Sequence, residues 1–91
     1  EEPGVPGKVQ NLAYDVPIRT ATWDAAATAL TYQLEYKLDD VTGVWGTAFE
    51  GDTTAALHDP GAGDWIYRVR GINANGSGEW SDELPVTVPA E

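Results

Sequence analysis

The chain has 91 residues, a length for one domain, and it lacks cysteine, which excludes a disulfide framework and a thiolate metal site. Fifteen acidic residues against five basic ones give a formal net charge of −10. Nucleic acid is therefore excluded as a partner, because phosphate binding needs a basic patch, and no apolar run reaches the roughly 18 residues that insert across a bilayer. The charge indicates a solubility device, with a basic or divalent-cation partner as the alternative.

Alternation of apolar and polar residues predicts seven short strands. We expect them near residues 8–14, 19–24, 30–38, 44–50, 53–58, 64–73 and 80–88. In the clearest cases, large apolar side chains share one side of a strand; these are Tyr32, Leu34, Tyr36, Trp65, Tyr67 and Val69. Ile66 and Ile72 fall on the opposite side of their strand. One apolar and one mostly polar face are typical of antiparallel sheets with one side in solvent.

Helical signal is nearly absent. Residues 25–30 (Ala-Ala-Ala-Thr-Ala-Leu) favour a helix for less than two turns and carry no amphipathic stripe, so we interpret them as a loop. Turn sequences with Gly, Pro, Asn or Asp separate the strands, at 15–17, 39–43, 51–52, 59–61 and 73–78. This pattern predicts an all-β, immunoglobulin-like sandwich of seven antiparallel strands over residues 6–88, between linker stubs at 1–5 and 89–91.

Taken in order, several segments resemble the fibronectin type III domain. Residues 6–12 (Pro-Gly-Lys-Val-Gln-Asn-Leu) are similar to its lead-in, and Trp23 stands at the position of its core tryptophan. Residues 32–36 (Tyr-Gln-Leu-Glu-Tyr), 57–61 (Leu-His-Asp-Pro-Gly) and 67–81 match later stretches in the same order. The resemblance covers nearly the whole chain and implies fibronectin type III topology.

Three positions depart from the family pattern. Trp65 stands at the tyrosine-corner position, where an indole has one donor and no acceptor, so a corner hydrogen bond to a backbone carbonyl needs a different geometry. Gly71 replaces an alanine and is expected to give up a little packing. Asp24 stands where the family often has proline.

The sequence offers no catalytic constellation. His58 is the only histidine, and the predicted sandwich puts it near one pole while Ser77 lies toward the other, so a Ser–His–acid triad cannot form. We expect His58 to be a surface residue at a strand end. Acidic pairs lie in loops or at strand ends, where we interpret them as solvated charge without the spacing of a calcium loop; they are Asp39–Asp40, Glu50 with Asp52, and Glu79 with Asp82–Glu83. We therefore expect no enzyme activity, no catalytic residue, no cofactor and no metal ligand.

Four residues form the predicted interaction surface. Trp45 on an edge strand and Trp80 at the start of the last strand either cap the core or, if exposed, stack on sugars or anchor a protein interface. Asn75 and Ser77 lie in the loop 73–78, which is the commonest contact loop of the family that the chain resembles. Asn75-Gly76-Ser77 fits a glycosylation acceptor and also a plain turn.

The resemblance implies a non-catalytic spacer or adhesion module of a larger secreted or virion protein. We expect a monomer whose partners are neighbouring domains of the parent chain and, where it recognises anything further, a protein or a glycan. The short loops and the stretch 68–76 look most like modules of phage tail proteins that contact the host. The alternatives are an accessory domain of a bacterial secreted polysaccharide hydrolase and an engineered binding scaffold.

Overall fold

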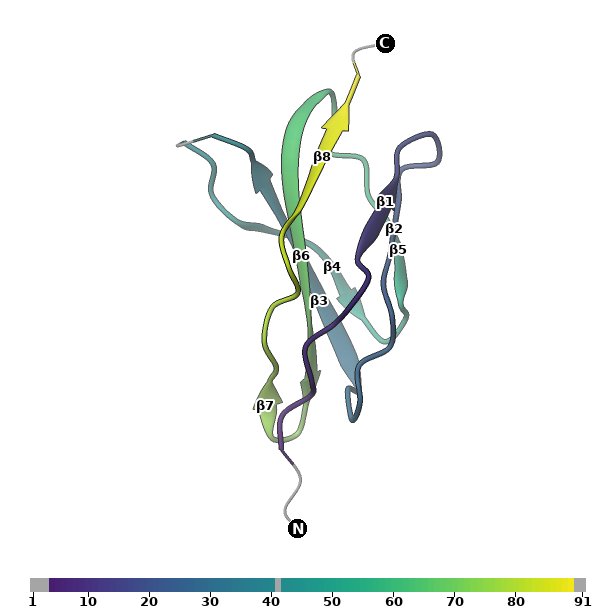
Figure 1. Ribbon diagram of the computed structural model, residues 1–91, viewed down its shortest axis with the longest axis vertical. Coiled ribbons are helices and arrows are strands. Elements are labelled where there is room, and N and C mark those ends of the chain that lie inside the picture. Colours follow the sequence, from purple (N-terminus) through teal and green to yellow (C-terminus); the bar gives the residue numbers. More distant parts are fainter. Residues whose placement is uncertain (1–3, 41, 90–91) are drawn as a thin grey trace.

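Two antiparallel sheets face each other in this computed structural model, which describes residues 4–40 and 42–89 (Figure 1). The smaller sheet has the order β1-β2-β5, and in the larger sheet β4, β3, β6 and β7 follow one another while β8 also pairs with β6. The strands are β1 (Ala13–Asp15), β2 (Thr20–Thr22), β3 (Thr31–Leu38), β4 (Gly46–Gly51), β5 (Ala55–Leu57), β6 (Gly63–Asn73), β7 (Gly76–Ser77) and β8 (Leu84–Val88). The described residues contain no helix, so the all-β sandwich is confirmed, with eight strands in place of seven.

The two longest strands form the centre of the larger sheet. β3 and β6 pair from Thr31 opposite Ile72 to Leu38 opposite Trp65, and β4 joins β3 with a register shift between Leu34 and Glu35. Residues 25–30 are a loop, as expected. The boundaries of β3, β4 and β6 agree with the expected strands within two residues.

The first and last expected strands are shorter than the sequence indicates. Residues 8–12 join no ladder, and Asn11 within them adopts a left-handed φ of 58°. The last strand begins at Leu84 instead of residue 80. Alternation reports which side chains face inward, whereas a ladder also needs a neighbouring backbone at hydrogen-bond distance. At both places one bond replaces a ladder: Gln10 O accepts from Asp24 N–H (3.1 Å), and Ser81 N–H donates to Val69 O (2.7 Å).

Side chains from both sheets form one core. The buried hydrophobic residues are Val9, Ala21, Trp23, Tyr32, Leu34, Ala56, Tyr67, Val69, Val86 and Val88. Trp23 packs against Tyr32 and Phe49, with ring centroids 5.9 and 6.1 Å apart. Of the inward set predicted on β3 and β6, four residues are buried in the core, whereas Tyr36 and Trp65 are half-buried and pack against it. Ile66 and Ile72, on the opposite side, are half-buried.

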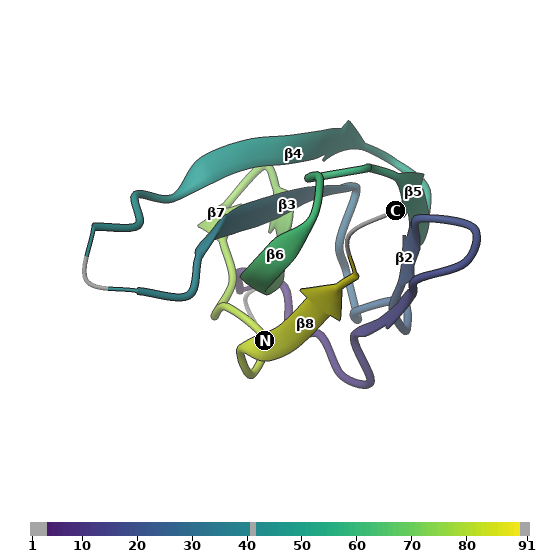
Figure 2. The ribbon, with the colours of Figure 1, turned by 90° about the horizontal axis from the view of Figure 1, so that it is seen from above.

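The molecule is elongated, with extents of 51 × 27 × 17 Å. Its amino-terminal and carboxy-terminal ends lie at opposite ends of the long axis (Figure 1). The loop 16–19 and residues 39–40 and 42–45 lie at the carboxy-terminal pole, and the turn between β6 and β7 lies at the amino-terminal pole (Figure 1). Seen along the axis, β4, β3, β6 and β8 follow one another on one side, and β2 and β5 lie together on the other (Figure 2).

Candidate functional site

His58 and the two serines do not meet. His58 directly follows β5, whereas Ser77 belongs to β7 at the amino-terminal pole (Figure 1). Ser81 is 6% exposed, and its hydroxyl accepts a bond from Val69 N–H (3.1 Å) and donates one to Asp82 O (3.1 Å). The Ser81 hydroxyl therefore serves as a hydrogen-bond partner for the backbone of β6.

His58 is half-buried among tyrosines, so its interpretation as a surface residue is wrong. Its Nδ1 lies 2.8 Å from the Tyr67 hydroxyl, and its ring centroid lies 4.3 Å from that of Tyr36. Tyr14 donates a hydrogen bond of 2.6 Å to the His58 carbonyl. Burial lowers the pKa of His58 and raises the pKa of Tyr67, so the neutral imidazole and the protonated phenol are the favoured pair. The cluster joins both sheets.

No metal-binding group is formed by the described residues. Within 4–40 and 42–89, no three His, Asp or Glu side chains are placed to hold an ion. The same part of the chain contains no helix long and apolar enough to span a membrane.

Trp45 and Trp80 lie on the outer face of the larger sheet, where the Arg68 guanidinium connects them. The carbon at its centre lies 4.0 Å from the centroid of each indole. Arg70 lies over the Trp80 ring, with its guanidinium carbon 4.3 Å from the ring centroid. The Lys37 ammonium lies 5.3 Å from the centroid of Trp45. Such contacts are attractive because the ring faces are electron-rich. We call these five residues the Trp–Arg ladder.

Two polar side chains of β3 hold the arginines in place. Glu35 Oε1 accepts from Arg68 Nε (3.2 Å) and from a terminal nitrogen (2.7 Å). Gln33 Oε1 accepts in the same way from Arg70, at 3.0 and 2.7 Å. Both indoles are half-buried, and guanidinium groups lie over them where a sugar ring would have to stack. The side chains of the Trp–Arg ladder are therefore held in a fixed arrangement. A ligand would meet the edges of the indole rings and the charged groups, because the guanidinium groups cover the ring faces.

Asn75 and Ser77 belong to the turn after β6 and to β7, at the amino-terminal pole (Figure 1). Asn75 is exposed, its N–H donates to Asn73 Oδ1 (2.8 Å), and its side-chain amide reaches Gly4 O at 3.3 Å. Asn73 also donates to Gly4 O (3.1 Å) and to Thr28 O (3.2 Å), so its amide ties the turn to two neighbouring segments. The two tryptophans thus contact the arginines of β6, whereas Asn75 and Ser77 belong to the turn and the short strand that follow β6.

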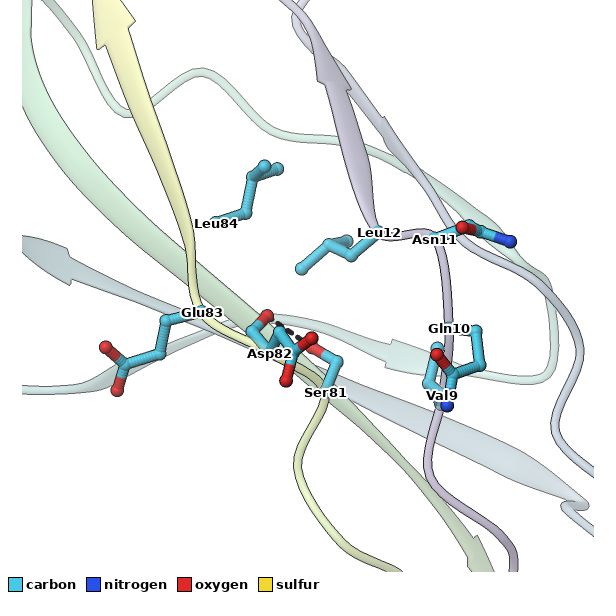
Figure 3. A pocket seen from close by; sticks show the side chains of 8 residues that line it. All are labelled: Val9, Gln10, Asn11, Leu12, Ser81, Asp82, Glu83 and Leu84. Carbon is cyan, nitrogen blue, oxygen red and sulfur yellow. Dashed lines mark hydrogen bonds between the residues drawn. The ribbon is translucent and has the colours of Figure 1, made fainter.

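Sequence reasoning missed three features. It did not name Arg68 and Arg70 as partners of the tryptophans, although arginines two apart on the outward side of a strand are a visible signal. It did not foresee the role of Asn73. It also missed a groove of about 230 Å³ between residues 9–12 and 81–84, because no sequence pattern reports where two sheets separate (Figure 3).

Comparison with known proteins shows similarity in structure only. No family model and no curated protein matches the sequence. The twitchin kinase region from C. elegans superimposes with a TM-score of 0.76 at 14% identity, covering 96% of this chain, which spans 17% of that structure. The fourth FNIII domain of a human protein gives 0.74 at 25% identity, covering 100% of this chain and 82% of that one. An Fn3-like protein from Clostridium thermocellum gives a TM-score of 0.67 at 21% identity, covering 98% of this chain and 96% of that one.

Proposed function

Because this chain has the fibronectin type III fold, we propose that it is a non-catalytic, rod-shaped module that links and spaces neighbouring domains of a larger secreted or virion protein. The fold supports a structural or binding module. The observation that carries the spacer role is the placement of the two ends at opposite poles of a body 51 Å long (Figure 1). A chain that enters at one pole and leaves at the other holds its neighbours apart.

For the parent protein we propose a phage tail protein that contacts the host, with a secreted polysaccharide hydrolase as the alternative. The short loops and the stretch 68–76 support the first. The complete parent gene tests the choice: neighbouring tail-fibre domains support the phage assignment, and a hydrolase domain on the same chain contradicts it. In either setting we expect an extracellular or virion-associated monomer.

End-to-end distance tests the spacer role directly. We expect three fused copies to hold terminal dyes nearly three times as far apart as one copy, because rods joined pole to pole add their lengths. A flexible chain grows only with the square root of length, roughly 1.7-fold for the same tripling. Because three rods of 51 Å place the dyes beyond the range of energy transfer, two-colour single-molecule localisation of the dyes distinguishes the two. Growth close to the square root contradicts the spacer role, and a Gly/Ser chain of equal length serves as the control.

A further inference from the structure

The two sheets separate along the side of the sandwich where β1 and β8 lie, and this leaves the groove between residues 9–12 and 81–84. Leu12 and Leu84 point toward each other across it (Figure 3). Val9 is 1% exposed and forms part of the lining. The two leucines form an apolar patch within a lining that is otherwise mostly polar, and a groove between two backbone segments is a shape that an extended peptide fits.

Both strands beside the groove have one unpaired edge. In the part of the chain that the structure describes, β8 forms a ladder with β6 alone and β1 with β2 alone. Residues 9–12 and 81–84 share no ladder, and the backbone bonds found for Gln10 and Ser81 run to Asp24 and Val69. Unpaired edges are templates for an added strand. Pro85 has no N–H, so we expect the added pairing to centre on residues 82–84.

The surroundings of the groove are strongly acidic. Residues 8–15 and 79–84, with the adjacent Asp24, contain one base and five acids, a net charge of −4 (+1 − 5). Asp24 belongs to this group because it accepts a bond from Asn11 (2.7 Å). The base is Lys8, whose ammonium lies 2.7 Å from Asp82 Oδ1 while the Asp82 side chain is still 88% exposed. The chain itself thus shows that Asp82 accepts an ammonium group at this place.

We propose that this groove binds an extended basic segment of a partner protein, which adds as a strand to the free edge of β8 and places a lysine or arginine at Asp82. Alternate side chains of a strand point to opposite sides, so one apolar residue faces Leu12 and Leu84 while its basic neighbours face the acids. The proposal goes beyond the spacer role and does not depend on it. A second copy of this chain is a poor occupant, because two chains of charge −10 repel each other.

The test uses the complete 91-residue chain and a labelled Lys-Val-Lys-Val-Lys peptide at low salt. We expect binding to shift the backbone amide signals of Asp82, Glu83 and Leu84. Asp82→Asn should weaken binding about three- to fivefold, the scale of one exposed charge pair. Lys8→Gln should strengthen it about twofold, because it frees the carboxylate. Glu50→Gln, which removes an equal charge from the distant strand β4, is the matched control and should leave affinity nearly unchanged.

Four outcomes overturn the proposal. Equal weakening by Asp82→Asn and Glu50→Gln indicates attraction by net charge alone. Equal binding by a peptide with N-methylated backbone nitrogens excludes strand addition. Weaker binding after Lys8→Gln excludes competition for Asp82. Shifts at Asp82 with calcium but none with the peptide indicate a cation site instead. The spectra report in each case that the variant is folded.

Discussion

At the scale of single residues, Trp65 takes over a hydrogen bond that the fibronectin pattern gives to tyrosine. Its indole nitrogen donates to Gly61 O across 3.0 Å, which fixes the loop before β6 to the strand. The sequence indicates this possibility, because an indole carries one donor. The bond runs only four residues back along the chain, and Gly61 adopts a φ of 91°, a conformation that glycine tolerates.

Trp65→Phe tests this corner bond. We expect a loss of about 1 kcal/mol in the free energy of unfolding, the usual contribution of one hydrogen bond, measured by urea denaturation. Trp45→Phe shows separately what replacing an indole by a phenyl ring costs in the Trp–Arg ladder, where Arg68 lies over the ring. A Trp65→Phe variant as stable as the unmodified chain contradicts a stabilising corner bond.

His58 makes stability depend on pH in a defined direction. Because burial holds its pKa below the ordinary value of 6.5, the unfolded chain binds a proton first as the pH falls. The stability that this residue contributes is present above pH 6.5 and is lost as the pH drops toward the lower, folded pKa. Asp59 opposes the shift. Tyr36 and Tyr67 contact the ring, and Tyr14 bonds the backbone carbonyl of the same residue.

Denaturation between pH 7.5 and 5 measures this dependence. We expect the free energy of unfolding to fall over this range, and His58→Gln to reduce the slope, because glutamine does not titrate. An unchanged slope in His58→Gln assigns the dependence to the carboxylates and contradicts the proposed role of His58.

At the scale of elements, Gly71 shows why one strand needs a residue without a side chain. A β-carbon there would lie 2.9 Å from Ala29 Cβ and 3.0 Å from Pro6 Cβ. The expectation that glycine gives up packing is therefore wrong: β6 is approached here by the loop 24–30 and by the amino-terminal segment. Sequence reasoning could not see this, because it reports the neighbours along the strand and not those across the sandwich.

Gly71→Ala should destabilise the domain by about 1–3 kcal/mol, the cost of an overpacked site. Ala29→Gly in the same chain should recover part of the loss, because it removes one of the two clashing carbons. Thermal or urea unfolding of both variants measures the effect. A stable single variant, or a double variant no better than the single one, contradicts the steric explanation.

The difference between neighbours along a strand and neighbours across the sandwich also explains which strands the sequence pattern predicts well. β3 and β6 are long, alternate clearly and pair with each other over eight positions, so pattern and ladder coincide. Residues 8–12 alternate too, but their neighbour is the groove and not a strand. For the site, aromatic type singles out Trp45 and Trp80 but leaves core capping and surface contact both open. Their contact with Arg68 appears only once the fold brings the segments before β4 and after β7 onto β6.

At the scale of the whole molecule, a net charge of −10 on a body of 51 × 27 × 17 Å opposes folding through self-repulsion. Three local features act in the other direction: the Lys8–Asp82 pair, the Arg68–Glu35 pair and the Trp–Arg ladder. The Lys8–Asp82 pair is exposed, so solvent and salt screen it and its contribution is small. Arg68 and Glu35 are 21% and 15% exposed, so salt screens that pair less.

Added salt should therefore stabilise the domain. Raising NaCl from 10 to 150 mM shortens the Debye length from about 30 to about 8 Å, which weakens repulsion across the surface more than it weakens contacts of 2.7 Å. We expect the free energy of unfolding at pH 7 to rise over this range, and Arg68→Gln to be less stable at both concentrations while keeping the same rise. A fall in stability with salt contradicts this argument, because it means that local ion pairs outweigh the repulsion of the excess acids.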